Sequence, residues 1–346
     1  MSPQSSRLTA ANTIRRGFSP RTHHSTVPPP AVFSTPRFRV WRKDCACPTA
    51  PAVRRHFCDT SGRHLKFKAW ILLVRPLNLL ITAVAVAVGA LVSTGEAAVL
   101  TDSRLWTAMF VASIIAAGGY ALNDAADYAI DRLNRPNRPV ASGALSPSRA
   151  RMTGLALSIL GVLCAFMLPV EAFFIAVVTA PALLIYAAFS RSLPVIGNLL
   201  VAACAAAGFL FGSVAVRADI GQTWWPALFA LLVHFARELL KDVEDLPGDR
   251  ESGRKTLPLI QGTPLTLRLA GGVLLLTAML TPVPGYAGNL HPVYLPVVLL
   301  STALPMAYTA GGAIVYPDRF DVSSSQKRLK WLMLTGMGSF LTGALL

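Results

Sequence analysis

The chain has 346 residues, of which 53% are hydrophobic and only 14% are charged. This composition is typical of a polytopic membrane protein and excludes an ordinary soluble domain. The net charge of +15 does not indicate nucleic-acid binding, because most of the excess lies in residues 1–68 without any basic and aromatic platform. The five cysteines are an odd number and predict no disulfide framework.

Residues 1–66 are rich in Arg, Ser, Thr and Pro and nearly free of acids. Because the segment has no long apolar run, it is not a secretory signal and is typical of an organelle transit peptide. Arg outnumbers Ser in it, which favours the mitochondrial inner membrane over that of the plastid. A disordered basic tail is the alternative interpretation.

Residues 67–346 contain nine apolar runs, each about long enough to cross a hydrocarbon core of roughly 30 Å as a helix. The sequence therefore predicts an all-α, polytopic membrane domain with about nine transmembrane helices. The runs cover 69–93, 105–122, 152–170, 172–189, 196–216, 224–241, 267–283, 291–313 and 329–346.

The loops between these runs alternate in charge. Those after the second, fourth, sixth and eighth runs are rich in Arg and Lys, whereas those after the odd runs are nearly free of them. The positive-inside rule therefore places the segments 123–139 and 241–250 on one side of the membrane. Gly and Pro within several runs, such as Gly89 and Gly212, indicate close packing between helices.

Acidic residues are concentrated in these same two segments, directly after the second and sixth runs. Side chains three or four residues apart share one helix face, so each segment predicts an acidic ridge, and the two ridges can face each other across a cavity. Crowded carboxylates repel one another unless a cation lies among them, which indicates bound metal. Asp124 and Glu244 fall off the ridges, and we expect them to be loop or cap residues. The predicted metal ligands are Asn123, Asp127, Asp131, Asp242, Asp245 and Asp249.

Two facing carboxylate clusters beside basic side chains suit a diphosphate bridged by Mg²⁺, a hard cation that takes oxygen ligands. The matching reaction is loss of pyrophosphate from an allylic prenyl diphosphate, followed by capture of the prenyl cation by an acceptor. Asp127, Asp131, Asp245 and Asp249 are the predicted catalytic residues. The predicted diphosphate-binding cations in these segments and directly after them are Arg135, Arg138, Arg250, Arg254 and Lys255.

These motifs, with Asn-Arg-Pro-Asn-Arg-Pro at 134–139 and Lys-Asp-Val-Glu-Asp-Leu-Pro-Gly-Asp at 241–249, resemble those of the UbiA-type intramembrane prenyltransferases. The resemblance covers roughly residues 67–346. It implies a nine-helix bundle around a central cavity, Mg²⁺ dependence and a lipid product. It also implies that Arg191 and Lys241 contact the diphosphate and that Asn78 and Tyr186 line the substrate cavity.

Within that family the motifs look most like those of geranylgeranylglyceryl phosphate geranylgeranyltransferases and chlorophyll synthases. The expected partners are a prenyl diphosphate donor, a hydrophobic or amphipathic, non-aromatic acceptor and the lipid bilayer. An aromatic acceptor such as hydroxybenzoate or homogentisate is the alternative. Two rivals remain open: a cation- or proton-coupled transporter, and a protein that binds isoprenoid without turnover.

Overall fold

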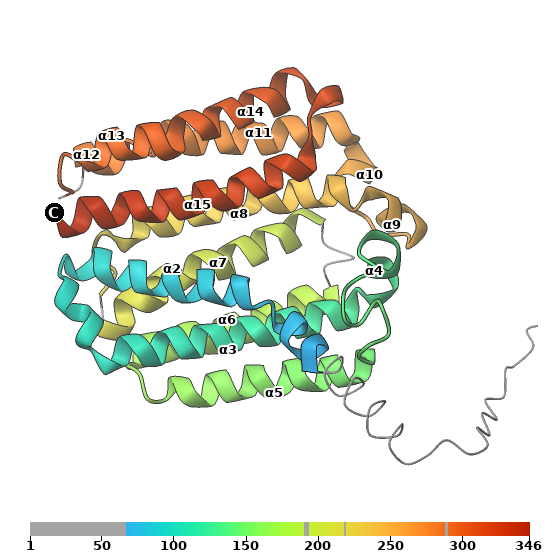
Figure 1. Ribbon diagram of the computed structural model, residues 1–346, viewed down its shortest axis with the longest axis horizontal. Coiled ribbons are helices and arrows are strands. Elements are labelled where there is room, and N and C mark those ends of the chain that lie inside the picture. Colours follow the sequence, from blue (N-terminus) through green and yellow to red (C-terminus); the bar gives the residue numbers. More distant parts are fainter. Residues whose placement is uncertain (1–66, 190–193, 218, 288–289) are drawn as a thin grey trace, which may run out of the picture. The chain divides into compact units, whose positions relative to one another are not determined.

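The computed structural model describes residues 67–346 except 190–193, 218 and 288–289, and all of these belong to one compact unit. The predicted transit peptide over 1–66 and the predicted diphosphate contact Arg191 lie outside the described residues. Throughout the described part of the chain the regular structure is helical, with no strand, as the sequence predicts. Figure 1 shows long helices running side by side, with short helices at their ends.

The chain enters the bundle through a helix over residues 67–74 that breaks at Arg75. The long helices are α2 (Pro76–Thr94), α3 (Ser103–Ala126), α5 (Pro147–Ala165), α6 (Val170–Phe189), α7 (Pro194–Arg217), α8 (Trp224–Glu244), α11 (Thr263–Leu280), α14 (Leu304–Val315) and α15 (Val322–Leu345). The short α-helices are α4 (Tyr128–Asn134), α9 (Leu246–Glu251), α10 (Leu257–Gln261), α12 (Val283–Ala287) and α13 (Tyr294–Val298). A π-helical segment, Leu299–Ala303, joins α13 to α14, and 3₁₀ turns cover Ala97–Thr101, Gly221–Thr223 and Pro317–Arg319.

Seven helices in the described residues are long and apolar enough to cross a membrane, so the prediction of about nine is not confirmed. Helices α8 and α15 occupy the predicted sixth and ninth runs but are not among the seven. Their charge explains the difference, because α8 carries Arg237, Glu238, Lys241 and Asp242 in its last two turns and α15 begins with a polar, basic turn. The all-α, polytopic class is confirmed.

Local sequence signals account for several helix starts. Asp102 precedes α3 and its side chain accepts a hydrogen bond from the backbone N–H of Arg104. Ser146 caps α5 in the same way, with Pro147 in the first helical position, where its missing N–H costs nothing. Asp321 caps α15 through the backbone N–H of Ser324. Such caps satisfy backbone donors that a helix start otherwise leaves unpaired.

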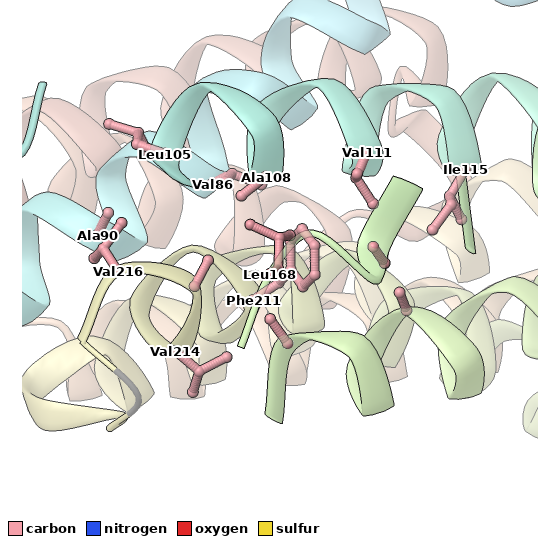
Figure 2. Close-up of a cluster of buried hydrophobic side chains, with 14 of the residues drawn as sticks. Val86, Ala90, Leu105, Ala108, Val111, Ile115, Leu168, Phe211, Val214 and Val216 are labelled. Carbon is pink, nitrogen blue, oxygen red and sulfur yellow. The ribbon is translucent and has the colours of Figure 1, made fainter. Parts of the chain in front are cut away.

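Small residues set the closest helix contact, between α2 and α7. A Cβ atom at Gly89 would lie 2.0 Å from the backbone oxygen of Phe209, and one at Gly212 would lie 1.9 Å from that of Val86. Glycine is therefore required at both positions, as the predicted close packing implies. Figure 2 shows the apolar cluster beside this crossing, in which Phe211 of α7 packs near Val111 of α3 and near Leu168, which lies between α5 and α6.

The two acidic segments meet at one end of the bundle. Helices α4 and α9, which carry the second halves of the two ridges, lie there together (Figure 1) and contact each other directly. The prediction that both segments lie on the same side of the membrane agrees with this arrangement.

Candidate active site

Each acidic ridge passes through a joint between a long helix and a short one. Asp127 links α3 to α4 with φ −91° and ψ 8°, and Asp245 links α8 to α9 with φ −85° and ψ 0°. Backbone hydrogen bonds four residues apart continue across both joints, from Asp131 to Asp127 at 2.8 Å and from Asp249 to Asp245 at 3.0 Å. The ridges therefore keep the predicted spacing, although each spans two helices rather than one.

The side chain of Asn134 fastens the two short helices together. Its Nδ2 donates to the backbone oxygen of Asp245 at 3.0 Å, and its Oδ1 accepts from the backbone N–H of Gly248 at 3.1 Å. A Cβ atom at Gly248 would lie 2.6 Å from Asn134 Nδ2, so only glycine allows this approach. Sequence reasoning had no signal for this contact, because the partners are more than 100 residues apart.

Each joint aspartate pairs with an arginine that lies in the opposite segment or directly after it. Both guanidinium Nη atoms of Arg135 lie 2.8 Å from carboxylate oxygens of Asp245, a bidentate pair. Arg254 reaches Asp127 at 2.9 Å. Both aspartates are buried. The two predicted ridges therefore face each other, linked by charge-assisted hydrogen bonds in both directions.

The first segment holds a further ion network around Arg138. Arg138 lies 2.6 Å from Asp131 and 3.3 Å from Asp124, and Asp124 also bonds to Arg75. The expectation that Asp124 is a loop or cap residue is wrong, because its side chain is only 1% exposed and joins two arginines. Arg75 has φ 54° in the left-handed region, a strained conformation for arginine that marks functional positions more often than ordinary loops.

The carboxylates of the second segment make fewer ion pairs with basic side chains. Asp249 is fully buried, and among the described residues neither of its carboxylate oxygens accepts a hydrogen bond. Its one ion pair there is with Arg254, at 3.5 Å. Asp242 accepts from the side chain of Asn198 at 2.8 Å. Burial raises the pKa of Asp249 above its ordinary value, against the opposing effect of Arg254. Burial likewise raises the pKa of Asp131, against the effect of Arg138.

These carboxylates fit a hard divalent cation. Within the described ranges no three Asp, Glu, His or Cys side chains converge closely enough to hold a metal alone. Mg²⁺ suits such a site, because it commonly takes one or two carboxylates and completes its shell with phosphate oxygens and water. The buried Asp249 carboxylate, with two oxygens that accept no hydrogen bond, offers a ready anchor.

A cavity of about 500 Å³ opens beside these ridges within the bundle. Most of its wall is apolar, with Ile81, Phe209 and Phe229 among its members, and its polar members include Asn78. That Asn78 contacts a substrate there stays a prediction. A cavity of about 10 Å³ lies against the second ridge and is lined by Tyr186, Asn198, Lys241, Asp242, Asp245, Arg254 and Thr256. The small cavity brings the predicted Tyr186 to the acidic side of the site, and Lys241 lines both cavities.

Of the remaining predicted residues, two lie at the ridges or the cavities and two lie at the surface. Asn123 is buried one turn before Asp127, and Lys241 pairs with Glu238 at 3.0 Å. Arg250 and Lys255 are exposed and line neither of the two cavities. Their predicted contact with a diphosphate stays a prediction.

Comparisons with known proteins agree with this geometry. Residues 79–327 match the UbiA prenyltransferase family. The chain is 34% identical to the digeranylgeranylglyceryl phosphate synthase of Methanopyrus kandleri over 80% of this chain and 100% of that protein. It is also 34% identical to the enzyme of the same name from Natronomonas pharaonis, over 79% of this chain and 95% of that protein.

Solved structures of similar proteins share the fold. One, from a study of digeranylgeranylglyceryl phosphate synthase in membranes, is 29% identical, covers 81% of this chain and 99% of its own, and has a TM-score of 0.66. A UbiA homolog from Archaeoglobus fulgidus bound to GPP and Mg²⁺ is 16% identical, covers 79% of this chain and 99% of its own, and has a TM-score of 0.58.

Proposed function

Because the chain belongs to the UbiA prenyltransferase family, we propose that it transfers a polyprenyl group from a prenyl diphosphate to a glyceryl phosphate lipid. The observation that carries the proposal is the pair of buried acidic ridges that face each other beside a largely apolar cavity. Buried carboxylates and arginines suit a polyanionic headgroup, and the apolar wall suits a hydrocarbon chain.

Two sets of residues would bind the prenyl diphosphate donor, one through Mg²⁺ and one directly. The ridge residues Asn123, Asp127, Asp131, Asp242, Asp245 and Asp249 are those we propose to hold Mg²⁺. Mg²⁺, when bound, would offset the negative charge of the diphosphate leaving group. Arg135, Arg138, Lys241 and Arg254 lie among these carboxylates and would exchange them for phosphate oxygens when the donor binds.

The reaction breaks the bond between the allylic carbon and the diphosphate oxygen, and the electron pair leaves with pyrophosphate. A hydroxyl oxygen of the acceptor then bonds to the allylic carbon, and its proton passes to an oxygen of the departed pyrophosphate. The apolar wall around Ile81 and Phe229 keeps water from the cation before the acceptor captures it.

The names of the relatives support a geranylgeranyl donor and a geranylgeranylglyceryl phosphate acceptor, since both compared enzymes are digeranylgeranylglyceryl phosphate synthases. The test is a matrix of donors and acceptors with purified protein in detergent and Mg²⁺. Geranylgeranyl, farnesyl and longer diphosphates would each be paired with geranylgeranylglyceryl phosphate, chlorophyllide, hydroxybenzoate and homogentisate.

We expect product with the glyceryl phosphate acceptor, lost on addition of a chelator. Product with hydroxybenzoate or homogentisate alone would identify an aromatic prenyltransferase instead. Folded protein that releases no pyrophosphate from any pair would contradict catalysis and favour the binding or transport alternatives.

We also propose that residues 1–66 are a transit leader for the mitochondrial inner membrane, separate from the membrane domain of 67–346. The Arg-rich, acid-poor composition of the leader supports this, and the compared relatives are archaeal and do not bear on it. A fluorescent protein fused to residues 1–66 would enter mitochondria, and plastid or cytosolic fluorescence would contradict the proposal.

A further inference from the structure

The main cavity carries more positive charge than its neighbouring carboxylates neutralise. Six basic side chains line it: Arg75, Arg135, Arg138, Arg237, Lys241 and Lys330. Four of them have carboxylate partners, namely Arg75 with Asp124, Arg135 with Asp245, Arg138 with Asp131 and Lys241 with Glu238. Glu244, an acid that also lines the cavity, lies 3.6 Å from Arg135. Within the described residues the other two, Arg237 and Lys330, make no ion pair.

Arg237 is held in place by α15. Its Nε donates to Gln326 Oε1 at 3.3 Å, and Gln326 Nε2 donates back to the backbone oxygen of Arg237 at 2.9 Å. No other hydrogen bond of the guanidinium to a described residue occurs, so both Nη atoms remain available to a ligand. This oriented, planar pair of donors matches the oxygens of a phosphate.

Lys330 lies one turn after Gln326 on the same face of α15, since residues four apart are neighbours on a helix. Helices α8 and α15 pack against each other (Figure 1), and Lys330 lies within electrostatic reach of Arg237. A half-buried arginine without an ion pair is costly in a membrane bundle, and such residues mark ligand sites. The pair therefore indicates a place for an anion.

The size of the unmatched charge indicates which anion. The acids within electrostatic reach of Arg237 and Lys330 are Glu238 and Glu244, and these pair with Lys241 and Arg135. Two cations without an ion pair of their own suit a phosphate monoester, which carries about −1.5 to −2 at pH 7. The donor's diphosphate is already provided for by the acidic ridges and their own arginines. We propose that Arg237 and Lys330 form a second anion subsite, which binds the phosphate group of the acceptor lipid. This rests on the proposed function, in which the acceptor is a glyceryl phosphate.

Kinetics with Arg237→Gln and Lys330→Gln test the subsite. We expect KM for geranylgeranylglyceryl phosphate to rise at least about tenfold in each variant, because one charged hydrogen-bond partner is lost. KM for geranylgeranyl diphosphate stays at its wild-type value, and Arg237→Lys recovers part of the loss. Lys327→Gln, which removes an exposed charge one turn earlier on α15 and outside the cavity, is the matched control. A rise in the donor KM instead of the acceptor KM would overturn the subsite.

A binding measurement separates the subsite from the reaction. Thermal stabilisation of the Mg²⁺-free protein by geranylgeranylglyceryl phosphate would be compared with stabilisation by the same lipid alcohol without its phosphate. We expect the phosphate to add stabilisation in the wild type and in Lys327→Gln, and to add little in Arg237→Gln and Lys330→Gln. Equal stabilisation of the wild type by both lipids would overturn the subsite. Failure of turnover alone would instead contradict the proposed function.

Discussion

The two acidic segments have the same backbone design but differ in how their carboxylates are neutralised. In both, a long helix ends at an aspartate with φ near −90° and ψ near 0°, and a short helix carries the next ridge aspartate. In the first segment, Asp131 bonds tightly to Arg138 at 2.6 Å. In the second, the equivalent Asp249 lies 3.5 Å from Arg254 and has no hydrogen bond to a described residue.

The difference indicates that the two segments have different roles: one binds the metal more strongly, and the other contacts the diphosphate. Carboxylates of the first segment are already satisfied by arginines, so a cation must displace those arginines to bind there. The buried Asp249 is less satisfied, and a divalent cation gains more by binding to it. We therefore expect the second segment to dominate metal affinity, while the first presents Arg138 to the diphosphate.

The largest effect is expected at the joint aspartates, where the two segments depend on each other. Asp127→Asn or Asp245→Asn removes the charge that faces both the cation and an arginine of the opposite segment. Turnover should fall by about 10²–10³-fold, the usual scale for loss of one preorganised electrostatic group. Product formation at saturating Mg²⁺ and donor measures this.

Glu251→Gln is the control for charge alone, because Glu251 is an exposed acid at the end of α9. Its turnover should equal that of the wild type. If only one of the two joint variants loses activity, the two segments do not act as a pair and the comparison fails.

The sequence predicted much of this fold because hydropathy and loop charge are local properties. Each of the nine apolar runs is helical in the structure, and the loop-charge pattern placed both segments at one end of the bundle. The count of membrane spans was less predictable. Charged residues in α8 line the site, so this helix lacks the hydropathy of a simple span.

The site was predicted where it depends on spacing along a helix and missed where it depends on tertiary contact. A four-residue step identified Asp127, Asp131, Asp245 and Asp249, and hydrogen bonding carries that step through both joints. Asp124 lies off the ridge, and one of its two arginine partners, Arg75, is 49 residues away in the chain. The spacing of residues along the sequence cannot identify an ion-pair partner so far away in the chain.

A smaller effect distinguishes the two ridge aspartates of the short helices. Asp249→Asn should raise the Mg²⁺ concentration needed for half-maximal thermal stabilisation by roughly tenfold, since it removes the least satisfied carboxylate. Asp131→Asn should raise it less, because Arg138 already neutralises Asp131. Melting curves at increasing Mg²⁺, without substrate, measure both.

The pH dependence of the same titration provides a second check. Burial raises the pKa of Asp249, so protons compete with Mg²⁺ at a higher pH than for an ordinary carboxylate. Mg²⁺ affinity should therefore weaken as pH falls toward that raised pKa, and this dependence should be shallower in Asp249→Asn. A larger Mg²⁺ effect in Asp131→Asn than in Asp249→Asn would reverse the proposed roles of the two segments.

The smallest effect concerns the contact that holds the two segments together. Gly248→Ala places a Cβ atom 2.6 Å from Asn134 Nδ2, so the Asn134 amide must move away from its hydrogen-bond partners on the second segment. Asn134→Ala leaves room but removes the two hydrogen bonds to the second segment. Each change should lower turnover by about fivefold, equivalent to about 1 kcal/mol, with the metal ligands themselves intact.

The double variant decides whether this contact works as one unit. Once Asn134 is alanine, the added methyl group at Gly248 no longer meets a side-chain amide, so Gly248→Ala should cost little further activity. Two changes that share one contact are expected to be non-additive in this way. If their effects on turnover simply add, Asn134 and Gly248 act separately, and the two segments are held in register by the paired arginines alone.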